Sequence, residues 1–142
     1  MALEVGSLLG GCYRIEGALG EGGMASVYRA VHVITGQHVA AKVLRAPEAP
    51  AQRSEILHLF EQEFTTLAQV SHPRVVAGYD YGIDPHAGPF YVMELLDGGD
   101  LHQRAPMPWR ELCAAARDVC AALALLHSRR LVYRDLSPKN VR

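Results

Sequence analysis

Residues 19–28 read LGEGGMASVY, and this stretch decides how the rest of the chain is interpreted. Three glycines, Gly20, Gly22 and Gly23, stand between two stretches with strand character, residues 13–16 and 26–31. Glycines allow backbone N–H groups to approach a phosphate because no side chain intervenes. An ordinary hairpin loop fits the same pattern. A dinucleotide-binding loop fits it poorly, because that loop opens a helix and a strand follows here.

Further elements are predicted on the C-terminal side of this hairpin. Strands are expected at residues 37–44, 75–81 and 90–95, and helices at residues 54–69 and 109–127. Ser54 is the expected cap of the first helix, whose apolar residues recur at helical spacing: Ile56, Phe60, Phe64 and Leu67. This order predicts an α+β fold, in which an antiparallel sheet with one covering helix precedes the start of a helical lobe.

Composition narrows the class of protein. The 142 residues are 49% hydrophobic and 20% charged with a net charge of -1, which is typical of one globular domain and disfavours nucleic acid as a partner. The longest apolar run, residues 119–126, is too short to span a membrane. Three cysteines without a CxxC pair are typical of the reducing cytoplasm. We therefore expect a cytoplasmic domain without a membrane segment.

Two charged residues stand in apolar surroundings. The chain has only two lysines, and Lys42 lies within the apolar strand of residues 37–44. Glu63 borders the apolar stripe of the following helix. Because an ammonium is costly to bury unpaired, Glu63 is the expected partner of Lys42. Alternatively, the two residues do not pair: Lys42 lies on a solvated face of the strand, and Glu63 is a solvated charge at the edge of the apolar stripe.

A polar loop near residue 140 combines a carboxylate with an amide. Asp135 and Asn140 lie five residues apart after a short apolar stretch. An aspartate orients and deprotonates a hydroxyl, and an asparagine oxygen ligates Mg²⁺. The same residues are also suited to an ordinary turn.

The order of these features resembles the protein kinase family, and residues 19–28 look most like its bacterial Ser/Thr branch. The resemblance covers the chain from about Tyr13 to Arg142. It implies an N-terminal extension at residues 1–12 and an incomplete kinase domain at residues 13–142. Within that domain it implies an N-lobe of five antiparallel strands plus the helix known as αC (residues 13–93), a hinge (94–100) and the start of the C-lobe (101–142).

The resemblance also implies ATP and Mg²⁺ as ligands and a role for each matching residue. Lys42 would hold the α- and β-phosphates while paired with Glu63, Asp135 would be the catalytic base, Lys139 would neutralise charge on the transferred phosphate, and Asn140 would bind Mg²⁺. The remaining nucleotide-binding positions would be Leu19, Gly20, Glu21, Gly22, Gly23, Met24, Ala25, Ser26, Val27, Ala40, Met93, Glu94, Leu96 and Asp100. Among these, Val27 and Ala40 would flank the adenine, Met93 would be the gatekeeper, and Asp100 would bind the ribose.

The sequence departs from the family pattern at several positions. Ala25 replaces the third glycine, at a cost of about 1 kcal/mol if that position needs a positive φ. Tyr133 stands where a histidine is usual. Ser137 stands where Ser/Thr kinases usually carry a lysine, and Lys139 lies where tyrosine kinases often place theirs.

No Asp-Phe-Gly follows Asn140 within these 142 residues, so we expect the chain by itself to transfer no phosphate. The function expected from the resemblance is phosphoryl transfer from Mg-ATP to a protein Ser/Thr hydroxyl. Two alternatives stay open: a non-catalytic kinase-like module that binds nucleotide or protein, and a small-molecule phosphotransferase of related fold. The sequence does not identify the protein substrate.

Overall fold

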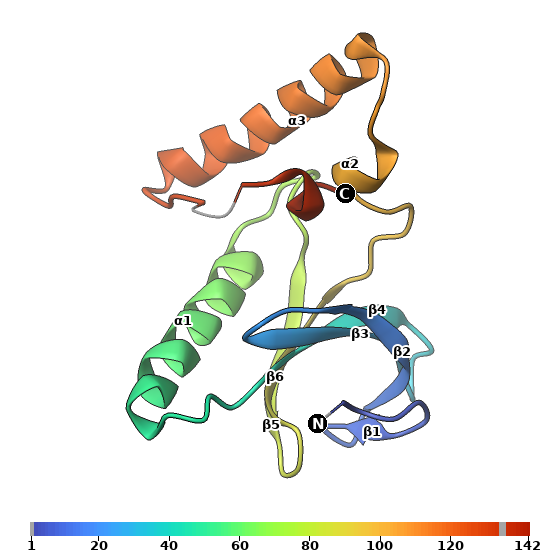
Figure 1. The fold of residues 1–142 in the computed structure, drawn as a ribbon, viewed down its shortest axis with the longest axis vertical. Helices are drawn as coiled ribbons and strands as arrows, with labels where there is room; N and C mark the ends of the chain where they lie inside the picture. The colour runs from blue at the N-terminus through green and yellow to red at the C-terminus, as the bar shows by residue number, and fades with distance from the viewer. Residues whose placement is uncertain (1, 134–135) are drawn as a thin grey trace. The chain divides into compact units, whose positions relative to one another are not determined.

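The structure, a computed structural model, describes residues 2–133 and 136–142. The chain divides into two compact units (Figure 1). The first unit comprises Met1–Gln69 and Ala77–Leu95, and the second comprises Val70–Val76 and Leu96–Arg142. The division after Leu95 falls within the segment that the sequence predicts to be a hinge.

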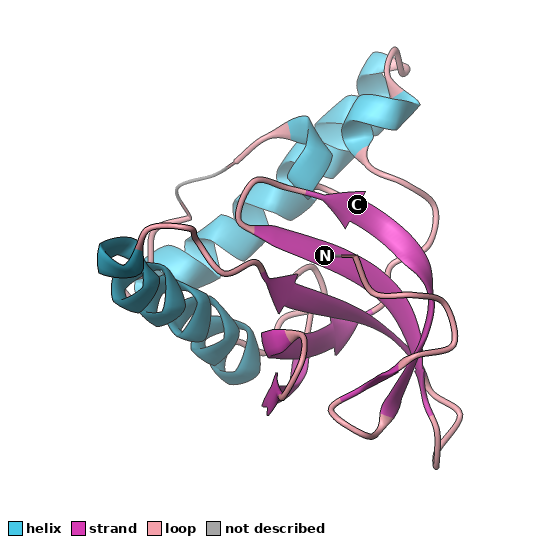
Figure 2. Ribbon diagram, turned by 60° about the horizontal axis from the view of Figure 1, so that its bottom comes forward, coloured by secondary structure: helices cyan, strands magenta, loops and turns pink. Residues whose placement is uncertain are grey.

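The first unit is built on an antiparallel sheet of six strands, which is strongly curled (Figure 2). The order of strands across the sheet is β1-β2-β3-β4-β6-β5. The strands are β1 Leu8–Leu9, β2 Tyr13–Glu21, β3 Ala25–His32, β4 His38–Leu44, β5 Gly78–Asp84 and β6 Gly88–Glu94.

Two aspartates on β5 join the opposite edges of this sheet. The Tyr13 hydroxyl donates to Asp80 Oδ2 at 2.9 Å, and the Gly10 N–H donates to Asp84 Oδ2 at 2.9 Å. Burial, reinforced by the hydrogen bond to Asp80, raises the pKa of Tyr13 to about 12. The Asp84 carboxylate also accepts from the N–H groups of His86 and Ala87, each at 2.8 Å. The edges of the sheet are therefore closed by side chains where no ladder of backbone hydrogen bonds joins them.

The two faces of the sheet pack into separate apolar clusters, because successive side chains of a strand point to opposite faces. The inner face of the curl holds the larger cluster, which is formed by Leu9, Tyr13, Ile15, Tyr28, Ala30, Val39, Ala41, Val43, Phe90 and Val92. The other face carries Leu44 and Tyr91, which pack with Phe60 of the helix α1. The alternate residues of β4, including Lys42, consequently face away from the larger cluster.

Helix α1, Pro50–Gln69, covers this second face. The predicted stripe of Ile56, Phe60, Phe64 and Leu67 does pack against the sheet. The helix begins at Pro50, so the predicted cap at Ser54 is wrong. Proline suits the first helical position, because its missing N–H has no intrahelical partner there.

The second unit contains two α-helices and a 3₁₀ turn, η1. Helix α2, Leu101–Arg104, begins with a capping box: the Asp100 carboxylate accepts from the Gln103 N–H at 2.8 Å, and Gln103 Oε1 accepts from the Asp100 N–H at 3.1 Å. Helix α3 is Trp109–Ser128 and η1 is Pro138–Asn140. Within the unit, Arg74 pairs with Asp118 at 3.3 Å, and the Leu101 N–H donates to the Val141 carbonyl at 2.9 Å.

The fold class predicted from the sequence is confirmed, and the structure differs from the prediction in four details. The sheet has six strands where five were expected, because residues 8–9 pair with residues 13–14 as an added edge. The strand expected at residues 75–81 lies at Gly78–Asp84, and the short helix α2 was not predicted. Residues 1–12 were expected as an extension, and Leu9 within them is fully buried. Among the described residues, no helix has the length and apolar character needed to cross a membrane.

Replacing Asp84 tests the closure of the sheet. We expect Asp84→Ala to lower the free energy of unfolding by about 1–3 kcal/mol at neutral pH, because three N–H groups lose their acceptor. These hydrogen bonds, foremost that from Ala87, lower the pKa of Asp84. A lowered folded-state pKa gives stability that is present above the unfolded-state pKa, about 3.9, and is lost as the pH falls through the folded-state pKa.

The measurement is urea unfolding of both proteins across this pH range. The difference between wild type and Asp84→Ala should shrink at about pH 2.5 relative to pH 7. Glu55→Ala, at an exposed carboxylate on α1, is the matched control and should change stability by less than about 0.5 kcal/mol. An equal difference at both pH values would contradict this account of Asp84.

Candidate functional site

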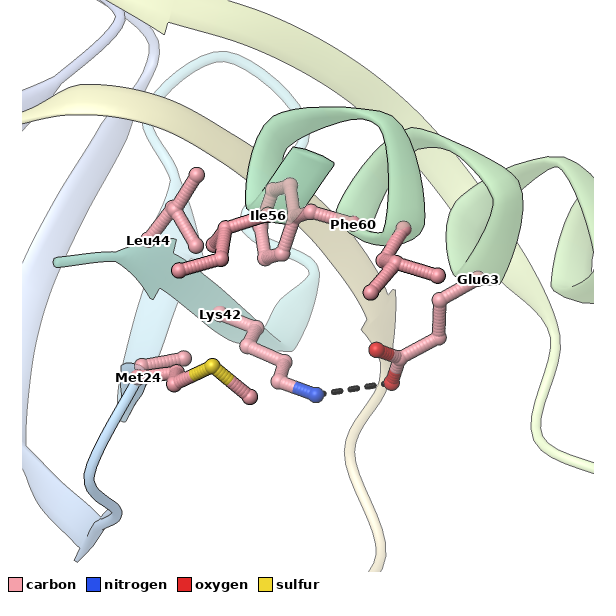
Figure 3. Close-up of a pocket in the computed structure, with 8 residues that line it drawn as sticks. Met24, Lys42, Leu44, Ile56, Phe60 and Glu63 are labelled. Carbon is pink, nitrogen blue, oxygen red and sulfur yellow. Dashed lines mark hydrogen bonds and ion pairs between the residues drawn. The ribbon is translucent and has the colours of Figure 1, made fainter. Parts of the chain in front are cut away.

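An ion pair joins the middle of the sheet to helix α1. The Nζ atom of Lys42, on β4, lies 2.7 Å from Oε1 of Glu63, and Figure 3 shows the two side chains pointing at each other. Lys42 is placed by strand alternation, which turns its side chain toward α1, and Glu63 lies one turn after the buried Phe60. The pairing predicted from the sequence is therefore present.

Tyr91 on β6 supports this pair. It lies directly opposite Lys42 in the strand register, and its hydroxyl donates to Glu63 Oε1 at 2.7 Å. The Lys42 Nζ also lies 5.7 Å from the centre of the Tyr91 ring. The rings of Phe60 and Phe64 lie 4.9 and 5.7 Å from that ring and fix its position. The sequence reading did not single out Tyr91, although pairing of the strands at 37–44 and 90–95 places it beside Lys42.

A small pocket of about 110 Å³ ends at the ion pair. Its wall is largely apolar and comes from β4, α1 and the loop between β2 and β3 (Figure 3). The lining residues are Met24, Ala25, Lys42, Leu44, Ile56, Leu59, Phe60 and Glu63. Met24, which follows Gly23 in the loop, and Ala25, the first residue of β3, therefore line the same pocket as the lysine and its partner.

The residues expected to contact an adenine share one face of the sheet with Lys42. Val27 lies opposite Lys42 in the register of β3 and β4, and Met93 lies opposite Ala40 in the register of β4 and β6. Since Ala40 and Lys42 are two residues apart on one strand, all four side chains point to the same face. Val27, Ala40 and Met93 thus form a small apolar surface beside the ammonium.

The loop between β2 and β3 is open where a ligand would need to approach. A Cβ atom built on Gly20 or Gly23 meets no other atom within 4 Å. None of Gly20, Gly22 and Gly23 has a positive φ, so the feature they share is the missing side chain. Among the described residues, Arg130 is the only non-glycine residue with a positive φ, so Ala25 carries no such strain. Leu19, Gly20 and Glu21 belong to β2, which extends further into the loop than expected.

The remaining predicted site residues belong to the second unit, apart from Glu94 at the end of β6. Asp100 is only 7% exposed, and its side chain caps α2. This structural role was not predicted from the sequence, although the Asp-x-x-Gln spacing indicates a capping box. Lys139 and Asn140 lie in η1, and Leu96 is half-buried. Asp135, the expected catalytic base, lies outside the described residues.

Few side chains in the part of the chain that the structure describes are arranged to bind a metal ion. No group of three or more His, Cys, Asp or Glu side chains gathers there in an arrangement that could hold an ion. Asn140 is the one residue expected to ligate Mg²⁺, and an amide oxygen is a suitable ligand for that ion.

Comparison with known proteins identifies close relatives of this chain. The model of the protein kinase domain family matches residues 13–141. The chain is 41% identical to the DNA damage-responsive serine/threonine-protein kinase RqkA of Deinococcus radiodurans, over 99% of this chain and 21% of that protein. It is 36% identical to the serine/threonine-protein kinase PknL of Mycobacterium bovis, over 95% of this chain and 34% of that protein.

A solved structure agrees with these matches. The kinase domain of Mycobacterium tuberculosis PknI is 31% identical and superposes with a TM-score of 0.77, over 98% of this chain and 57% of that domain. The chain thus spans between 21% and 34% of the length of the two curated relatives and 57% of the solved domain.

A double-mutant cycle tests whether the central pair forms in solution. We expect Lys42→Met and Glu63→Gln to show a coupling energy of about 0.5–1 kcal/mol, because the side chains are 24% and 47% exposed and water screens their attraction. The measurement is the free energy of unfolding of the wild type, both single variants and the double variant. A coupling energy of zero at low salt would contradict the geometry described here.

Proposed function

Because the chain belongs to the protein kinase family, we propose that it binds Mg-ATP and forms part of an enzyme that transfers the γ-phosphoryl group to a protein Ser or Thr hydroxyl. Residues 13–93 would form the N-lobe, residues 94–100 the hinge and residues 101–142 the start of the C-lobe. The single observation that carries the proposal is the Lys42–Glu63 pair, which holds an ammonium beside the glycine loop and the apolar surface of the sheet.

Several described residues support binding of a nucleoside triphosphate. Lys42 offers a compact positive charge to the α- and β-phosphates, and Glu63 keeps that charge oriented. The backbone N–H groups of the glycine loop are able to approach the phosphates because Gly20 and Gly23 have open space in front of them. Val27 and Ala40 would flank the adenine, and Met93 would limit the depth of its pocket.

The proposed roles of the groups that act on the acceptor hydroxyl rest on the resemblance of residues 134–140 to the kinase motif. Asp135 would accept the proton of the substrate hydroxyl, and Lys139 would neutralise charge on the transferred phosphate. Mg²⁺, when bound with ATP, supplies further charge neutralisation, and Asn140 would be one of its ligands. Asp100 would contact the ribose, and the backbones of Glu94 and Leu96 would bind the base. The chemistry asks mainly for positioning and electrostatic stabilisation.

These proposed roles distinguish the binding of ATP from the transfer of its phosphate. We propose that residues 1–142 bind ATP and transfer no phosphate by themselves, because no Asp-Phe-Gly is present among them to complete the Mg²⁺ site. A non-catalytic kinase-like module, which would bind nucleotide or protein, is the second candidate. The proposal places the chain in the cytoplasm, where ATP is available and where its three free cysteines stay reduced.

Calorimetric titration of the 142-residue chain with Mg-ATP tests the role of Lys42. Lys42→Met should weaken binding by about tenfold or more, because a charge-assisted contact with phosphate is worth about 1.5–3 kcal/mol. Arg53→Met removes a positive charge from an exposed site and should leave the affinity unchanged. Equal affinities for wild type and Lys42→Met would contradict the assigned site, and phosphorylation of a generic protein by this chain would contradict the separation of binding from turnover.

A second prediction concerns the open space at the glycine loop. Gly20→Val should leave the unfolding free energy within about 0.5 kcal/mol of wild type, because a Cβ atom at this position has open space around it. It should weaken ATP binding, because the side chain occupies the space through which the phosphates approach. Gly17→Val is the matched control, since Gly17 lies on the same strand with equally open surroundings. Loss of ATP affinity in both variants, or in neither, would refute this role of Gly20.

A further inference from the structure

Arg45, the residue directly after β4, makes three contacts with the tip of the hairpin formed by β2 and β3, residues 20–26, here called the glycine flap. Its Nε atom donates to Ser26 Oγ at 2.9 Å, and its Nη2 atom lies 3.3 Å from Glu21 Oε2. Its backbone N–H donates to the carbonyl of Met24 at 2.9 Å. One residue therefore contacts both strands of the flap and its tip.

The register shows why these contacts matter. Glu21 and Ser26 lie opposite each other as the last registered pair of β2 and β3 before the tip. The guanidinium binds both members of that pair. Ser26 is only 4% exposed, so its hydroxyl depends on a protein partner. Arg45 thus fixes the hairpin at the point where its ladder ends.

Arg45 approaches the flap from the side away from Lys42. Ser26 pairs with Val43, which belongs to the inner cluster, whereas the next residue, Val27, pairs with Lys42. Adjacent residues of a strand point to opposite faces, so the Ser26 hydroxyl and the guanidinium lie on the face opposite to the ammonium. A nucleotide held by Lys42 would not touch Arg45, and any effect of Arg45 on binding would be transmitted through the flap.

We propose that Arg45 is a positioning residue, which holds the glycine flap in the geometry that receives the phosphates of ATP. The inference rests on the proposed function of the flap. Gly20, Gly22 and Gly23 give this segment large conformational freedom, and ordering it on ligand binding costs entropy. A clamp that restricts the flap beforehand reduces that cost, so it favours the triphosphate without contacting it.

The test compares ATP with adenosine, which carries no phosphates. Arg45→Ala should weaken ATP binding by about fivefold and change adenosine binding by less than about twofold, because residues 20–26 would contact the phosphates, whereas Val27 and Ala40, which would flank the adenine, lie outside the flap. Ser26→Ala should shift the same ratio in the same direction. Arg29→Ala is the matched control: it removes an Arg–Glu pair between the same two strands, 3.1 Å from Glu16, on the part of the hairpin remote from the tip, and should leave the ratio unchanged.

Arg45→Lys separates positioning from simple charge attraction. Lysine keeps the charge but lacks the planar fork that contacts Ser26 and Glu21 together, so it should behave like alanine. Full recovery of ATP affinity by lysine would overturn the proposal, and so would equal losses of ATP and adenosine affinity in Arg45→Ala.

Hydrogen exchange in the unliganded chain provides a readout that is independent of nucleotide. The amides of residues 22–26 should exchange about fivefold faster in Arg45→Ala than in Arg29→Ala. If wild type binds no ATP, the proposed function fails, and the exchange rates alone decide whether Arg45 restrains the flap. Equal exchange rates in the two variants would refute the clamp even if ATP binds.

Discussion

The ion pair between Lys42 and Glu63 places a positive charge at the centre of a sheet whose two faces both carry apolar clusters. Its geometry depends on three separate features. Strand alternation points Lys42 away from the inner cluster, the apolar stripe of α1 seats the helix, and the Tyr91 hydroxyl shares the carboxylate oxygen. A change in the curl of the sheet or in the seating of α1 would separate the two charges.

The curl of the sheet is in turn fixed at its edges. Asp80 and Asp84 on β5 bind Tyr13 and Gly10 from the opposite edge, and the short strand β1 adds Leu9 to the inner cluster. At the other end of the same hairpin, Arg45 contacts the flap. The segment that carries the glycines is therefore restrained at its base by two carboxylates and at its tip by a guanidinium.

Sequence periodicity and the position of single charged residues predicted the covering helix and the central ion pair. The apolar spacing in residues 54–69 located the covering helix, and the isolated lysine in an apolar strand indicated its partner. Features that depend on tertiary contacts were missed. Strand β1 has two residues, which are too few to show a periodic pattern. The apolar residues Val75 and Val76 led to a predicted start of β5 that is three residues too early. Tyr91 and Arg45 act through the register between strands, which becomes visible only when the strands are paired. The proposed roles of Asp100, Asp135, Lys139 and Asn140 rest on the resemblance of the sequence to the kinase motifs.

Chemical modification of Lys42 tests the central claim most directly, because the chain has only two lysines and each is resolved by mass spectrometry of its peptide. The rate at which an amine-reactive reagent modifies Lys42 is measured alone, with saturating Mg-ATP and with adenosine. If Lys42 holds the phosphates, Mg-ATP slows its modification by about tenfold and adenosine gives much weaker protection. An unchanged rate in saturating Mg-ATP would contradict the account.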